Sequence, residues 1–156
     1  MLPLREQLLK TANTYIEAHN NIDLDGLRAI YAPSCVHRVS PSPISAIFPT
    51  CNNDESVAFT AEMFKIWHKF QCRQFTEPVV DEGTRKVVLF VESKGEADAG
   101  MYENEYVIKL KMNQDGTLIE DRLEFFDSQR VIEWVARLGQ VAQNILGRVD
   151  EAKTAA

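Results

Sequence analysis

The sequence predicts an α+β fold, with helices packed on one face of a strongly curved and mostly antiparallel sheet. Three observations predict this class. Apolar residues recur at helical spacing through most of the chain up to about residue 70, alternate with polar residues from about residue 72, and return to helical spacing after Asp127. Helices followed by a run of strands are typical of α+β proteins. A curved sheet of this kind can enclose a cavity, which is the default ligand site.

Three helices are expected in the first half of the chain. The second helix is short, with Asp23 as its N-cap and Pro33 as the residue that stops it. The third helix starts near Asn52, because Asn52 and Glu55 stand at the spacing of a capping box. The apolar face of the first helix comprises Leu4, Leu8, Ala12, Tyr15, Ile16 and His19. We expect His19 to be a packing residue of this face.

Residues 35–49 read CVHRVSPSPISAIFP and lie between the second and third helices. They predict a short strand and then a stiff loop, because each proline fixes φ and lacks a backbone donor. His37 and Arg38 are an unusual pair in an otherwise apolar strand, and strand parity allows only one of them to point inward. We expect the loop to cover the mouth of a pocket. Its apolar residues are Ile44, Ile47 and Phe48.

Four strands and a last helix are expected in the second half. The strands lie at about 72–80, 86–95, 101–113 and 117–126. Turns at DEGTR, EADAG and NQDG join them as hairpins, and Asp127 or Ser128 caps the last helix. The inward apolar residues of that helix are expected to be Val131, Ile132, Val135, Leu138 and Ala142.

Length and composition indicate a single domain at residues 1–146 with a polar, flexible tail at 147–156. The formal charge of −6 argues against nucleic acid as a partner. No apolar run approaches the roughly 20 residues of a membrane span, and the N-terminus lacks the apolar run of a signal peptide. Three cysteines without a CxxC spacing indicate free thiols, so we expect a cytoplasmic protein. No cofactor is expected, and no metal site either, because the three histidines are far apart in sequence.

The strand at 101–113 shows the clearest alternation. Its buried face would carry Tyr102, Asn104, Tyr106, Ile108, Leu110 and Met112. Asn104 and the Tyr106 hydroxyl are therefore polar groups on an apolar face and need partners. Two interpretations remain open: a structural hydrogen bond, or a polar patch that lines a pocket.

The last strand can be read in two ways. One face carries Leu118, Glu120, Arg122, Glu124 and Phe126, and the other carries Ile119, Asp121, Leu123, Phe125 and Asp127. The second face is the more apolar, so the pattern alone sends Arg122 and Glu124 to solvent. In the alternative, both point inward, and Arg122 holds a carboxylate charged in an apolar pocket.

Three stretches resemble a known family: CVHRVSP after a short helix, YENEYVIKL on a long strand, and DGTLIEDRLEFFDS before the final helix. With the order of elements, they resemble the cone-shaped barrels of the SnoaL-like, or nuclear transport factor 2-like, superfamily. Within it, they are similar to fungal cofactor-free isomerases that rearrange the D-ring of terretonin- and austinol-type meroterpenoids. The resemblance covers about residues 5–142.

The resemblance implies an isomerase of fungal secondary metabolism that acts on a small polycyclic substrate. If Leu123 and Phe125 then face outward beside Val107, they form an exposed apolar patch, so we expect a homodimer that buries it. Counting back from Asp127, it implies that Glu124 is the catalytic carboxylate, where related cyclases have Asp, and that Arg122 and Phe126 also face inward. Ile108 stands where ketosteroid isomerases have an acidic residue, which argues against that mechanism.

Further site residues complete the hypothesis. His37 could act as acid or base, and Arg38 could hold an anionic oxygen. The candidate substrate-binding residues are Phe48, Phe64, Trp67, Asn104, Tyr106 and Phe126. A non-catalytic binding module and a hydrolase or dehydratase are the alternative functions, because one fold serves many.

Overall fold

The structure, a computed structural model, describes residues 1–45 and 47–154; beyond residue 141 it describes the course of the last helix and not its side chains. Its elements are α1 (Leu4–Asn20), α2 (Leu24–Ile30), β1 (Tyr31–Ser40), α3 (Ser42–Ser45), α4 (Asn53–Ile66), β2 (Lys69–Gln74), β3 (Val79–Asp81), β4 (Lys86–Ala97), β5 (Gly100–Met112), β6 (Ile119–Phe126) and α5 (Ser128–Thr154). The α+β class and the order of its main elements are as predicted.

The sheet joins the two ends of the domain. Its strand order is β1-β6-β5-β4-β2, and β3 pairs with the same edge of β4 as β2 does. Every pairing is antiparallel except that of β1 with β6, which is parallel. The register of this parallel pair places His37 beside Arg122 and Val39 beside Glu124. The sheet topology therefore brings the two segments that carry the predicted site residues together.

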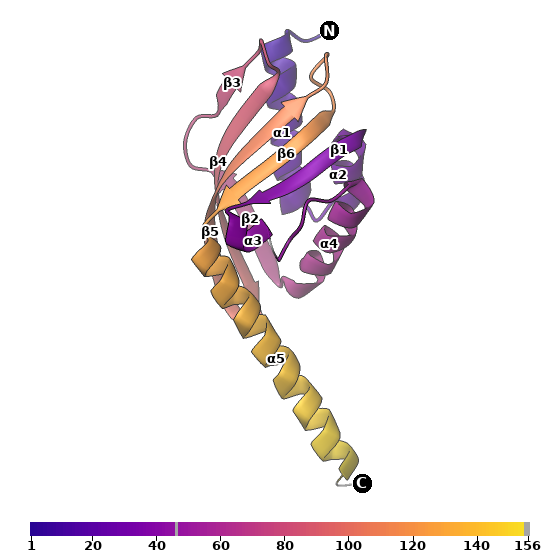
Figure 1. Cartoon of the computed structure of the whole chain (residues 1–156), viewed down its shortest axis with the longest axis vertical. Coiled ribbons are helices and arrows are strands. Elements are labelled where there is room, and N and C mark those ends of the chain that lie inside the picture. The colour runs from indigo at the N-terminus through magenta and orange to yellow at the C-terminus, as the bar shows by residue number, and fades with distance from the viewer. Residues whose placement is uncertain (46, 155–156) are drawn as a thin grey trace.

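Helices α1, α2 and α4 lie together on one side of the sheet, and α5 extends away from the rest of the molecule (Figure 1). The core lies between these three helices and the inner face of the sheet. Its fully buried members include Leu8 and Ala12 from α1 and Val87, Leu89 and Leu110 from the strands. The inner face of β5 is therefore the apolar face that the alternation predicts.

The helix starts follow local sequence chemistry. The Asp23 carboxylate accepts a hydrogen bond from the Gly26 amide at the start of α2, and Asn52 and Glu55 form a reciprocal capping box at the start of α4. Both caps confirm the prediction. The α2 helix ends earlier than expected, because Tyr31 is already extended and begins β1.

Two expectations on elements differ from the structure. The strand predicted at 72–80 is split into β2 and β3, and Pro78, which lacks an N–H donor, lies in the break. The proline-rich loop contains the short helix α3.

The last helix also differs from expectation. Ile132 and Val135 of α5 are exposed, whereas Val131 and Trp134 are buried; the side chain of Ala142 lies outside the described residues. The helix continues past Gly147, where the tail was expected to begin, and the division into residues 1–146 and 147–156 stays a prediction. Within the described part of the chain, no helix combines the length and apolar run that a bilayer span requires.

Candidate active site

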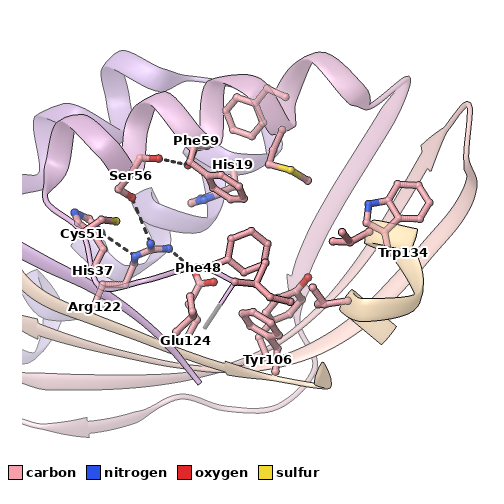
Figure 2. A pocket seen from close by; sticks show the side chains of 18 of the residues that line it. His19, His37, Phe48, Cys51, Ser56, Phe59, Tyr106, Arg122, Glu124 and Trp134 are labelled. Carbon is pink, nitrogen blue, oxygen red and sulfur yellow. Dashed lines mark hydrogen bonds and ion pairs between the residues drawn. The ribbon is translucent and has the colours of Figure 1, made fainter. Parts of the chain in front are cut away.

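A cavity of about 610 Å³ lies between the inner face of the sheet and helices α1, α4 and α5 (Figure 2). This volume is within the range of small-molecule sites. Its polar lining lies around Arg122 and Glu124, and Trp134 stands at the opposite side of the view. We call Tyr15, His37, Ser56, Arg122 and Glu124 the polar end. We call Trp67, Tyr102, Phe126 and Trp134 the aromatic end.

Arg122 and Glu124 both point inward from β6. Their side chains are only 12% and 15% exposed, and Arg122 Nη1 donates to Glu124 Oε1 at 2.5 Å. Their cross-strand neighbours on β5, Leu110 and Ile108, are buried, so the pair stands on the core face of the sheet. Arg122 and Glu124 therefore face inward, as the family resemblance implies, and the prediction from alternation alone, which sent them to solvent, is wrong.

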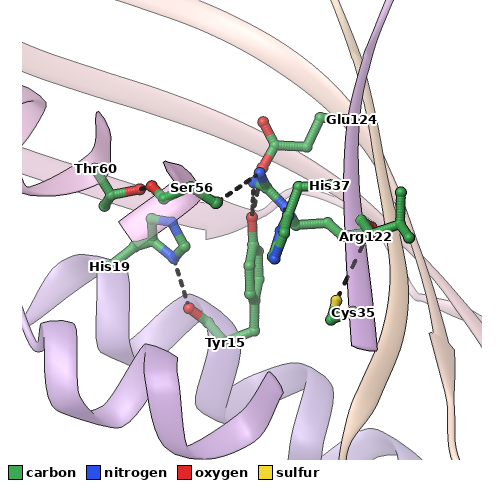
Figure 3. A network of polar contacts seen from close by, with 9 residues as sticks. Tyr15, His19, Cys35, His37, Ser56, Thr60, Arg122 and Glu124 are labelled. Carbon is green, nitrogen blue, oxygen red and sulfur yellow. Dashed lines mark hydrogen bonds and ion pairs between the residues drawn. The ribbon is translucent and has the colours of Figure 1, made fainter. Parts of the chain in front are cut away.

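Tyr15 of α1 completes the carboxylate's surroundings. Its hydroxyl donates to Glu124 Oε1 at 2.5 Å and accepts a bond from Arg122 Nη1 at 3.2 Å (Figure 3). Burial and the negative charge of Glu124 raise the pKa of Tyr15 well above its ordinary value, so the phenol keeps its proton. No described residue bonds Glu124 Oε2, although Glu124 lines the cavity.

The charge of Glu124 depends on Arg122. Burial raises the pKa of Glu124, but the guanidinium charge and the hydrogen bond from Tyr15 outweigh burial and lower the pKa below its ordinary value. Burial lowers the pKa of the Arg122 guanidinium, but the charge of Glu124 together with Tyr15 and Tyr31 outweighs burial and raises this pKa above its ordinary value. The cavity therefore holds an ionised carboxylate among mostly apolar walls.

His37 is the inward member of the pair on β1. It is 1% exposed, and its Nδ1 accepts from Arg122 Nε at 3.0 Å. Because Nδ1 is an acceptor, Nε2 carries the proton and donates to Asn53 Oδ1 at 2.8 Å. Burial and the charge of Arg122 lower the pKa of His37 to about 4, so the ring is neutral. Both nitrogens are occupied, and His37 orients Arg122.

Arg38 lies on the outer face of the sheet and forms an ion pair with Asp121. It does not line the cavity, because adjacent strand residues point to opposite faces. The expectation that Arg38 holds a substrate oxygen therefore does not fit its position.

Asn104 is also outside the cavity lining. Its amide donates to the Tyr102 hydroxyl at 2.8 Å and to the Asp127 carbonyl at 3.2 Å, which is the structural alternative of the two interpretations. The hydroxyls of Tyr102 and Tyr106 are 3.0 Å apart, and Ser93 donates to Tyr106. Both tyrosines line the cavity, and Asn104 orients the first of them.

The aromatic end is held by ring packing. The indoles of Trp67 and Trp134 are stacked, with centroids 5.2 Å apart and planes 10° from parallel. Trp67 lies directly over Gly95, where a Cβ would come 2.6 Å from its ring. Phe48, Phe64 and Phe126 also line the cavity, as expected, together with Ile47; Ile44 is fully buried behind them and does not.

Sequence reasoning missed several residues of the site, among them Tyr15, His19, Ser56, Tyr102 and Trp134. Tyr15 and His19 are four residues apart on the apolar face of α1, and this spacing does not separate a cavity wall from a core. The remaining histidine, His68, is exposed and bonds Asp98, as expected for a surface residue. No three of the described His, Cys, Asp and Glu side chains are grouped as metal ligands would be.

No family model matches the chain. Among curated proteins, austinoid biosynthesis clusters protein H of Penicillium brasilianum is 38% identical over 136 residues, which cover 86% of this chain and 92% of the relative. Austinoid biosynthesis cluster protein H of Aspergillus calidoustus is 36% identical over 137 residues, with the same coverage.

Solved structures agree with this fold. BvnE pinacolase from Penicillium brevicompactum superposes with a TM-score of 0.83 at 32% identity, covering 90% of this chain and 99% of its own. AusH from Aspergillus nidulans superposes with a TM-score of 0.72 at 35% identity, covering 81% and 88%. A protein from Jannaschia sp. CCS1 described as SnoaL-like shares the fold alone, with a TM-score of 0.68 at 14% identity over 85% of this chain and 93% of its own.

The fold defines a SnoaL-like α+β barrel, and its cavity holds the buried Arg122–Glu124 pair. The chain belongs to the fungal family of the austinoid biosynthesis cluster proteins. At the level of this family, the predicted class, an isomerase or cyclase of fungal meroterpenoid biosynthesis, is confirmed.

Proposed function

We propose that the protein is a cofactor-free isomerase that rearranges the ring system of a small polycyclic substrate, with Glu124 as the proton acceptor. The single observation that carries this proposal is an ionised carboxylate in a mostly apolar cavity, with one oxygen bonded and the other without a described partner. The names of the relatives support the substrate class and the reaction type: austinoid biosynthesis proteins and a pinacolase.

The geometry supports a simple division of labour. Glu124 Oε2 accepts a proton from a C–H or O–H bond of the substrate, the freed electron pair moves into the rearranging ring, and the carboxyl group returns the proton at another atom. Arg122 and Tyr15 hold Oε1 throughout and offset the change in charge. The proton is returned and no group is consumed, so the product has the mass of the substrate.

The Glu124→Gln variant tests this proposal. It keeps the shape and removes the acceptor, so turnover should fall about 10²-fold or more while the fold is retained. Isomer formation is followed by liquid chromatography and mass spectrometry with austinoid-pathway intermediates. Glu105→Gln, an exposed change on β5, is the matched control.

Three outcomes contradict the proposal. Turnover near the wild-type level in folded Glu124→Gln removes Glu124 from its role. A product that gains or loses the mass of water indicates the alternative hydrolase or dehydratase. Ligand binding without any turnover in the wild type indicates a binding module.

We also propose a homodimer through the outer face of the sheet. Phe125, Val107 and Phe90 are neighbours across three strands, and Phe75 packs on Phe90. Phe125 is 53% exposed and Val107 is 40% exposed, and monomers usually bury such apolar rows. Glu103 and Lys111 on the same face contribute little to pairing between subunits, because they already have partners in their own chain, Lys94 and Glu120.

The dimer proposal predicts that Phe125→Glu gives monomers in light scattering at micromolar concentration. A charge placed in a buried two-fold interface is repeated on both subunits and repels itself. Ile132→Glu, an exposed apolar position on α5 outside this row, is the control and should leave the dimer intact. A wild-type protein that is monomeric at this concentration rules out the interface.

We place the enzyme in the cytoplasm. Cys35, Cys51 and Cys72 are all free in the structure, which is the usual state of cysteines in a reducing compartment.

A further inference from the structure

His19 lines the cavity from the last turn of α1, four residues after Tyr15. Its Nδ1 lies 2.8 Å from the backbone carbonyl of Tyr15 (Figure 3). A carbonyl oxygen only accepts hydrogen bonds, so Nδ1 carries the proton and donates it. The neutral ring then has its lone pair on Nε2.

Burial keeps this ring neutral. It lowers the pKa of His19 below its ordinary value, against the bond to the Tyr15 carbonyl and the charge of Glu124, which both raise it. The charged and titratable groups around the ring are Tyr15, Arg122 and Glu124. Phe64 packs edge-on at 6.2 Å between ring centroids, which limits the tilt of the imidazole.

His19 and His37 differ in one decisive respect. The lone pair of His37 is on Nδ1 and is used by Arg122, and its Nε2–H is used by Asn53. At His19, no described residue bonds Nε2. Nε2 is not one of the fully buried polar atoms without a partner, so part of its surface is accessible. His19 therefore offers the cavity a neutral acceptor whose direction is set by α1.

We propose that His19 Nε2 accepts a hydrogen bond from a hydroxyl group of the substrate, so that the enzyme selects hydroxylated polycycles. This inference rests on the proposed function and adds a substrate class to it. The hydroxyl lies at the α1 side of the cavity, near the Glu124 carboxylate, and the apolar ring system extends toward Trp67 and Trp134. A neutral acceptor suits a hydroxyl better than it suits a ketone or carboxylate, because those groups bring no proton.

Binding is tested with two tetracyclic ketones that differ in one hydroxyl group, followed by the fluorescence of Trp67 and Trp134. Wild type should bind the hydroxylated ketone about tenfold more tightly, the worth of one net hydrogen bond. His19→Phe keeps the ring and removes the acceptor, so this preference should disappear. His19→Gln keeps an acceptor at about the position of Nε2 and should restore part of it. His68→Asn, at an exposed histidine, is the matched control.

Nitrogen NMR of ¹⁵N-histidine in the wild-type protein gives a readout that does not depend on any variant. Nε2 of His19 should be unprotonated. Its ¹⁵N chemical shift should change when the hydroxylated ketone is added and should not change with the other ketone. His37 should keep the opposite tautomer. A proton on Nε2 of His19, or equal binding of the two ketones by the wild type, overturns the inference. Loss of turnover in Glu124→Gln, which these measurements do not use, tests the proposed function separately.

Discussion

The two ends of the cavity are built by different means. At the polar end, the Arg122 guanidinium donates to four side chains, those of Tyr15, His37, Ser56 and Glu124. At the aromatic end, Trp67 and Trp134 are held by stacking and by the absence of a side chain at Gly95. A partner lost at the polar end leaves a buried charge uncompensated, whereas a ring lost at the aromatic end leaves space. We therefore expect the polar end to decide stability and chemistry, and the aromatic end to decide size and fit.

The largest loss of stability is expected for Arg122→Met. It leaves Glu124 buried without its partner, so the free energy of unfolding should fall by about 3–5 kcal/mol, and the pKa of Glu124 should rise. Urea unfolding at pH 7 measures the loss. The double variant with Glu124→Gln should recover part of it, since no charge remains to be compensated. A loss below about 1 kcal/mol would show that the ion pair is not the basis of the polar end.

A smaller loss in the free energy of unfolding is expected when the pH is lowered. The pKa of His37 is about 4 in the folded protein and about 6.5 in an unfolded chain, so the unfolded state binds more protons between these values. The stability that this difference supplies is complete above pH 6.5 and is lost as pH falls to 4. It amounts to about 3 kcal/mol. The lowered pKa of His19 acts in the same direction.

Urea unfolding at pH 7 and pH 4.5 measures this dependence. His37→Gln, which can still bond Arg122 and Asn53, should lose less stability between the two conditions than wild type does. Trp67→Phe, at the aromatic end, should keep the wild-type dependence. Equal acid sensitivity in wild type and His37→Gln would place the titrating groups elsewhere.

The smallest effect is expected for Gly95→Ala. The added methyl group would stand 2.6 Å from the Trp67 ring, so the indole must move into the cavity or away from Trp134. Overpacking of this kind costs about 1–3 kcal/mol of stability. Binding of a bulky ligand should weaken, while turnover at saturation changes less than in Glu124→Gln. Gly139→Ala is the control, because no described atom beyond its neighbours in α5 lies within 4 Å of the added carbon.

The same contrast explains what sequence could predict. Fold class, caps and strand positions follow from local periodicity and spacing, as at Asn52 and Glu55. Which face of β6 points inward does not follow from local periodicity, because Phe125 is apolar and exposed while Arg122 and Glu124 are charged and enclosed. Their orientation depends on Tyr15 and His37, which are distant in sequence. Only the family resemblance favoured the inward orientation of Arg122 and Glu124. The space that Gly95 leaves for Trp67 is likewise a tertiary feature without a local signal.

The parallel pairing of β1 with β6 has a consequence for synthesis on the ribosome. Arg122 bonds His37 across 85 residues and Tyr15 across 107, so these early side chains wait for the last strand to leave the exit tunnel. Until then β1 lacks its strand neighbour in the sheet, and an unpaired strand edge is a site for aggregation. A nascent chain that stalls before residue 119 has neither a catalytic carboxylate nor a protected edge. We expect the cell to depend on rapid completion of translation, or on a chaperone that covers β1.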